Sequence, residues 1–71
     1  MKFYYDKKLD AISIRFNDKA SAESEEMRDG VIFDYDKSGK IIAIELLDAS
    51  KVLAKETQIV EVSAAMPIMT S

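Results

Sequence analysis

The sequence predicts an α+β fold, with a single antiparallel β-sheet built as a meander of four to five strands and one short helix. Apolar and polar side chains alternate with a period of two through the first two thirds of the 71 residues. This alternation is typical of strands that bury one face. The short helix is expected after the apolar run Ile41 to Leu47, where Asp48 is suited to the N-cap position.

The N-terminal segment predicts the first two strands. Phe3 and Tyr5 lie on one face of a short strand. After a polar turn, the segment from Asp10 to Phe16 turns Ile12 and Ile14 to one side. We therefore expect two strands, each with one buried face.

The acidic segment Ala20 to Arg28 fits either an exposed edge strand or one turn of helix, and we predict the edge strand. Met27 is its only large apolar side chain, so the segment has little surface to bury. Charged side chains on an edge discourage pairing with other sheets. Asp29 and Gly30 then fit a tight turn, because glycine accepts a positive φ.

A hairpin between residues 31–36 and 41–47 is the most closely specified element. Pairing Asp36 with Ile41 makes one face apolar throughout, whereas a slip by one residue destroys that match. The register sets three apolar pairs, which are Tyr35 with Ile42, Phe33 with Ile44 and Val31 with Leu46.

One domain is expected over residues 1–63, since no linker, repeat or low-complexity tract divides the chain. Residues 58–62 are suited to a last strand. The apolar segment 64–71, which Pro67 interrupts, is either a disordered tail or a docking segment in an oligomer. A chain this short with no cysteine and no histidine lacks the disulfide and metal supports that small domains use, so a homo-oligomer is expected.

Negative charge is concentrated in the segment from Asn17 to Asp36. Seven acids and two bases give it a local charge of −5, while the whole chain carries −3. No cluster of lysine and arginine is present to displace phosphate counterions, so no nucleic-acid partner is expected. No apolar run approaches the roughly 20 residues of a membrane span, so we expect no membrane contact and a cytoplasmic location.

The acidic segment predicts a non-catalytic module that binds a basic protein. An exposed strand would supply backbone hydrogen bonds to the partner, and the acidic side chains would steer it. The alternative interpretation is a solvated acidic face that maintains solubility. The predicted partner-binding side chains are Glu23, Glu25, Glu26, Asp34 and Asp36.

A divalent-cation site is the alternative function. Asp34, Asp36, Ser38 and Glu45 fall at positions one, three, five and twelve of an EF-hand calcium loop. An EF-hand needs a helix before the loop, whereas residues 30–33 have the composition of a strand, so the plain hairpin is favoured. No cofactor is otherwise expected.

An enzyme is not expected. Without cysteine or histidine, a serine nucleophile would depend on lysine as its base, which is a rarer arrangement. The chain has two glycines, too few for a glycine-rich phosphate loop.

Three stretches of the sequence carry a family resemblance. They are Tyr5-Asp6 with Asp10 to Phe16, Gly30 to Asp36 with Gly39, and Ile44 to Ser50. Together they resemble the domain-of-unknown-function family 2283, which consists of small prokaryotic proteins. The resemblance extends from the N-terminus to about Leu53. The resemblance implies no activity, cofactor or catalytic residue. It does imply an antitoxin-like role beside a small toxin-like partner, since such pairs are suspected from gene neighbourhoods of the family.

Overall fold

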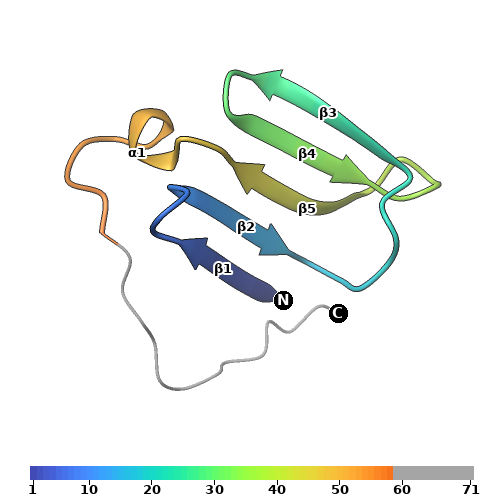
Figure 1. Ribbon diagram of the computed structural model, residues 1–71. Coiled ribbons are helices and arrows are strands. Elements are labelled where there is room, and N and C mark those ends of the chain that lie inside the picture. The colour runs from blue at the N-terminus through green and yellow to red at the C-terminus, as the bar shows by residue number, and fades with distance from the viewer. Residues whose placement is uncertain (59–71) are drawn as a thin grey trace.

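The fold is a single open sheet of five strands followed by one short helix (Figure 1). The structure is a computed structural model that describes residues 1–58. The sheet order is β1-β2-β5-β4-β3, and every neighbouring pair is antiparallel. The elements are β1 (Lys2–Asp6), β2 (Ala11–Arg15), β3 (Glu23–Arg28), β4 (Val31–Tyr35), β5 (Ile41–Leu46) and α1 (Ala49–Val52).

The five antiparallel strands agree with the predicted α+β class, in which the helix is a minor element of four residues. The predicted meander is wrong, because β2 pairs with β5 and not with β3. Ile12 and Ile14 of β2 lie opposite apolar side chains of β5, so the most apolar strand takes the centre of the sheet. The acidic strand β3 is left at the far edge.

The segment Ala20 to Arg28 contains the predicted edge strand. β3 is exposed at all six positions and, among the described strands, pairs with β4 alone. A bulge between Glu26 and Arg28 shifts its register by one residue. Bulges of this kind twist a strand and are common at sheet edges.

Strand pairing assigns side chains to two faces of the sheet, since directly opposed residues of antiparallel strands point to the same side. The apolar face consists of Phe3, Tyr5, Ile12, Ile14, Val31, Phe33, Ile44 and Leu46. Ile42 shares this face by alternation and is completely buried. The polar face consists of Lys2, Tyr4, Ser13, Arg15, Ser24, Glu26, Ile32, Asp34, Ala43 and Glu45.

The β4–β5 hairpin has the predicted register over most of its length. Val31 lies opposite Leu46 and Phe33 opposite Ile44, but Tyr35 lies opposite Ile41 and not Ile42. The reason is a bulge between Asp34 and Tyr35. The turn closes through a 2.9 Å hydrogen bond from the backbone N–H of Asp36 to the carbonyl of Lys40. The partner of Asp36 is therefore Lys40, one residue before the predicted Ile41.

Helix α1 begins where predicted but is capped from elsewhere in the chain. Asp48 occupies the N-cap position in a left-handed conformation, with φ of 50°, and its side chain makes no capping bond in the described part of the chain. The backbone N–H of Ala49 donates instead to the carbonyl of Asp10 at 2.8 Å. The Ser50 N–H donates to the Asp10 carboxylate, 3.2 Å from Oδ1 and 3.1 Å from Oδ2.

The C-terminal predictions fall mostly beyond the described residues. Gln58 is described outside any strand, while the rest of the predicted strand over residues 58–62 and the segment 64–71 lie outside the described range. Within residues 1–58, no helix has the length and apolar character needed to span a bilayer.

Candidate functional site

The outer edge of β3 is the most acidic exposed element of the sheet. Glu23 lies opposite Tyr35 and Glu25 opposite Phe33, so both carboxylates flank the apolar face. Glu26 lies opposite Ile32, on the polar face. We call these three exposed glutamates and the backbone between them the acidic edge. Among the described strands, the outer side of β3 has no partner. The acidic edge therefore combines a strand side open to pairing with negative charge on both faces, which suits a basic extended chain.

Asp34 does not reach the acidic edge, although its charge and position in the chain predict it among the partner-binding side chains. It is buried, with 6% of its surface exposed, and accepts a 2.5 Å hydrogen bond from Ser24 Oγ. The contact joins β4 to β3 across the polar face. Asp34 therefore supports the position of the edge strand and presents no open carboxylate to a partner.

Asp36, the fifth predicted partner-binding residue, organises the β4–β5 turn. Its Oδ1 accepts hydrogen bonds from Ser38 Oγ at 2.7 Å, from the Ser38 N–H at 2.9 Å and from the Lys40 N–H at 3.0 Å. Its Oδ2 lies 3.6 Å from Lys19 Nζ. These bonds, that from Ser38 Oγ above all, lower the pKa of Asp36 to about 2. Asp36 is therefore a structural turn residue with a paired charge.

Glu45 and Asp34 form a carboxyl pair on the polar face. They lie diagonally across neighbouring strands, since Asp34 pairs with Ala43. Hydrogen bonding to Asp34, partial burial and the charge of Asp34 raise the pKa of Glu45, while Arg15 acts in the opposite direction. The raised pKa of Glu45 is a property that sequence spacing did not indicate.

The four residues of the predicted cation site do not converge on one point. Asp34 and Glu45 stand on the polar face, while Asp36 and Ser38 are bonded to each other in the turn. Within residues 1–58, no group of three or more histidine, cysteine, aspartate or glutamate side chains is placed to hold a metal ion. Asp34 Oδ1 accepts instead from Ser24 of β3, and Asp36 Oδ1 accepts from Ser38 and Lys40 of the turn.

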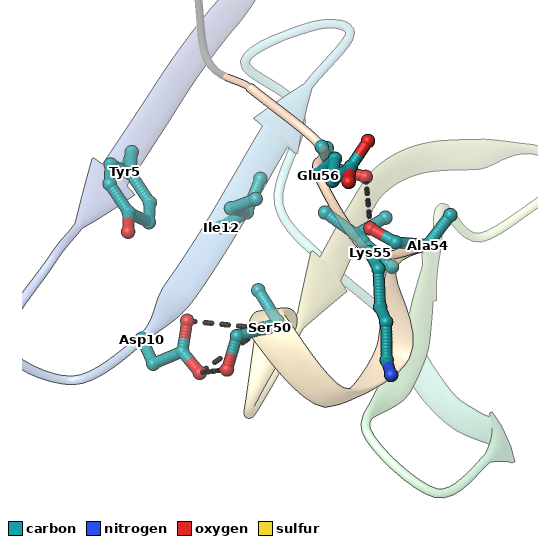
Figure 2. Close-up of a pocket in the computed structure, with 10 residues that line it drawn as sticks. Tyr5, Asp10, Ile12, Ser50, Ala54, Lys55 and Glu56 are labelled. Carbon is teal, nitrogen blue, oxygen red and sulfur yellow. Dashed lines mark hydrogen bonds between the residues drawn. The ribbon is translucent and has the colours of Figure 1, made fainter.

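A small open hollow of about 160 Å³ lies beside α1 (Figure 2). Tyr5 and Ile12 border it from the sheet, and Leu53 borders it from the end of the helix. Figure 2 shows the Asp10 carboxylate directed at Ser50, whose Oγ donates to Asp10 Oδ2 at 2.6 Å. Both carboxylate oxygens of Asp10 thus serve the helix cap. The exposed residues Lys55 and Glu56 line the hollow from the chain that follows α1.

Comparisons with known proteins give one family and no individual relative. The family model described as "Protein of unknown function (DUF2283)" matches residues 2–50. The matched range contains the five described strands, the Asp10 cap and the first residues of α1. No curated protein and no solved structure matches the chain.

Proposed function

The chain belongs to the DUF2283 family of proteins of unknown function, and from that premise we propose that it is a non-catalytic module that binds a basic protein along the acidic edge. One observation carries the proposal. Among the described strands, β3 forms one edge of the sheet, is exposed at all six positions and bears three glutamates.

Binding would proceed by addition of a partner strand. The outer backbone groups of β3 give such a strand hydrogen bonds that do not depend on sequence. Glu23, Glu25 and Glu26 supply the selectivity, because opposite charges on neighbouring strands stabilise a pair and like charges destabilise it. The acidic edge therefore favours a basic strand and disfavours an acidic one, including the β3 strand of another copy.

The carboxylates away from β3 support a binding role better than a catalytic one. Asp10 caps α1, Asp34 bonds to Ser24, and Asp36 holds the turn. Each of these groups is used to fix the fold, whereas the glutamates of the acidic edge are exposed. General acid–base catalysis needs a positioned group within reach of a substrate, whereas Asp10 at the hollow beside α1 and Asp36 in the hairpin turn are both held by hydrogen bonds of the fold. Lys55 and Glu56 also line the hollow, but both are exposed to solvent.

The proposed partner is a small basic toxin-like protein, which would make the chain an antitoxin. A short synthetic peptide of alternating lysine and valine serves as the probe, with a glutamate–valine peptide as its control. We expect the lysine peptide to slow amide hydrogen exchange along β3 and to leave β1 unchanged. Equal binding of both peptides, or protection confined to β1, would contradict strand addition at the acidic edge.

A matched pair of variants separates edge contact from general attraction. Glu25→Lys and Asp29→Lys change the net charge equally, but Glu25 lies on β3 and Asp29 in the turn that follows. We expect Glu25→Lys to abolish the exchange protection and Asp29→Lys to retain most of it. The antitoxin role requires, in addition, a complex with the basic product of a neighbouring gene in light scattering, and Glu25→Lys should dissociate that complex.

A further inference from the structure

We propose that two copies of the chain pair through the opposite edge strand, β1, in an antiparallel arrangement centred on Tyr4. β1 borders the sheet on the side away from β3, as Figure 1 shows, and all five of its residues are exposed. The inference is independent of the proposed function, because the two use different edges.

The sequence of β1 is complementary to its own reverse. In an antiparallel pair centred on Tyr4, Lys2 stands opposite Asp6 of the second copy, and Phe3 stands opposite Tyr5 of the second copy. The two-fold symmetry repeats both contacts, so each charge meets an opposite charge and each aromatic ring meets another. Opposed pairs of both kinds stabilise neighbouring antiparallel strands.

Exposed aromatic surface is concentrated on this strand. Phe3 is 52% exposed, Tyr4 55% and Tyr5 43%. Phe3 and Tyr5 lie on the apolar face, and Tyr4 lies on the polar face. A two-fold axis perpendicular to the sheet places the apolar faces of both copies on one side and their polar faces on the other. Five strands from each copy then form one continuous sheet in which the apolar faces join and the aromatic rings of the two β1 strands contact one another across the seam.

Charge excludes β3 as the self-pairing edge. Two antiparallel β3 strands would bring Glu23, Glu25 and Glu26 of both copies together, at a net charge of −2 per strand after Arg28 is counted. β1 is neutral, because Lys2 balances Asp6. Like charges on opposed strands are destabilising, so the second copy belongs at β1.

Head-to-tail pairing of β1 with β3 is also disfavoured. The two edge strands of one chain run in the same direction, since four successive antiparallel pairings separate them. Keeping the apolar faces on one side would then require a parallel pair, which is less stable per residue. Such a contact would also leave an open end at each copy, whereas the β1 pair closes on itself.

Both charged residues of β1 remain available for the pairing. Lys2 Nζ lies 3.3 Å from Asp18 Oδ1, and the two side chains are 56% and 80% exposed. Exposed ion pairs contribute little, so Lys2 can exchange Asp18 for Asp6 of the second copy at small cost. The bonds that Asp6 accepts from the N–H groups of Lys8 and Leu9 use Oδ1 alone.

Sedimentation equilibrium tests the pairing on the full chain. We expect a dimer for the unmodified protein, and a loss of about tenfold or more in its association constant for Lys2→Glu, which sets two acids opposite each other. Asp6→Lys alone should weaken the dimer as well, while an equal mixture of the two variants should restore it. A monomeric unmodified protein, or a mixture no tighter than its components, would overturn the proposal.

Cross-linking tests the register, because the chain contains no cysteine. Tyr4→Cys places two thiols at directly opposed positions, within reach of a disulfide. Lys2→Cys is the matched control on the same strand, since its two copies would lie about 13 Å apart, four residues along β1. We expect oxidation to link Tyr4→Cys and to leave Lys2→Cys unlinked. Equal linkage of both would disprove the register.

The two proposals fail separately. Glu25→Lys should leave the dimer mass unchanged, and Lys2→Glu should leave binding of the lysine–valine peptide to β3 unchanged. A dimer lost in Glu25→Lys would place the interface at β3 and overturn the β1 pairing. A retained β1 dimer without peptide binding would reject the proposed function alone.

Discussion

Gly30 and Leu47 approach each other so closely that no side chain fits between them. The Leu47 N–H donates to the Gly30 carbonyl at 2.8 Å. A Cβ at Gly30 would lie 2.5 Å from the Leu47 carbonyl oxygen and 2.9 Å from Cγ2 of Val52. The contact holds the β3–β4 turn against the chain between β5 and α1, so the position of the acidic edge depends on it.

Gly30→Ala should therefore destabilise the protein more than Gly39→Ala. Both glycines have positive φ, 80° and 82°, but a Cβ at Gly39 meets open space. We expect Gly39→Ala to cost about 1–2 kcal/mol from backbone conformation alone. Gly30→Ala adds overpacking of about 1–3 kcal/mol. Urea unfolding measures both variants, and equal losses would show that the backbone at Gly30 yields to the new methyl group.

Ser50→Ala should loosen α1, because the Ser50 hydroxyl bonds the Asp10 carboxylate at 2.6 Å. We expect a loss of about 1 kcal/mol in the free energy of unfolding and faster amide exchange at Ala49 and Ser50. Asp48→Asn is the control, because Asp48 makes no capping bond within residues 1–58 and asparagine tolerates its left-handed backbone. The control should stay within about 0.5 kcal/mol of the unmodified protein. A larger loss in the control would place the cap at Asp48 after all.

Acid should destabilise the fold through Asp36. Hydrogen bonds, that from Ser38 Oγ first among them, lower its pKa to about 2, below the value of about 3.9 in an unfolded chain. The stabilisation is therefore present above about pH 4 and is lost as the pH falls through about 2. Urea unfolding at a series of pH values measures the slope. Asp36→Asn should flatten it in this range, and an unchanged slope in the variant would assign the acid sensitivity to other carboxyls.

Glu45→Gln should stabilise the protein at neutral pH. Hydrogen bonding to Asp34 raises the pKa of Glu45, so the folded state favours the protonated form. The contribution of Glu45 is full below its unfolded pKa of about 4.3 and is lost as the pH rises through the higher folded value. Glutamine keeps a hydrogen-bond donor for Asp34 and carries no charge. We expect the variant and the unmodified protein to converge in acid. A variant that is less stable at neutral pH would mean that ionised Glu45 is needed, with Arg15 as its partner.

The sequence was sufficient for the parts of the fold that depend on neighbouring residues. Alternation located the apolar strands, and the apolar match of Val31 and Phe33 with β5 predicted the hairpin register. Charge and the lack of large apolar groups placed β3 at an edge. The pattern of residues alone therefore predicts that Glu23, Glu25 and Glu26 lie on an exposed strand.

The features that sequence reasoning missed depend on contacts between distant residues. Pairing of β2 with β5 has no local signal, because the apolar face of β2 matches several strands equally well. The Asp10 cap on Ser50 joins residues forty positions apart. Asp34 was expected at an accessible surface, but its bond to Ser24 and the neighbouring strands bury it. Hydropathy does not report such neighbours.

The pairing of β2 with β5 is the one pairing among the described strands that joins segments far apart in the sequence. Arg15 pairs with Ala43, which lies 28 positions later in the sequence. The chain between them must close into a loop before β2 can pair with β5. Strands β3, β4 and β5 follow one another as hairpins and can assemble locally. We therefore expect docking of the N-terminal hairpin to be the slow event of folding. During synthesis on the ribosome, Ile12 and Ile14 consequently lack their β5 partners, Leu46 and Ile44, until β5 has emerged.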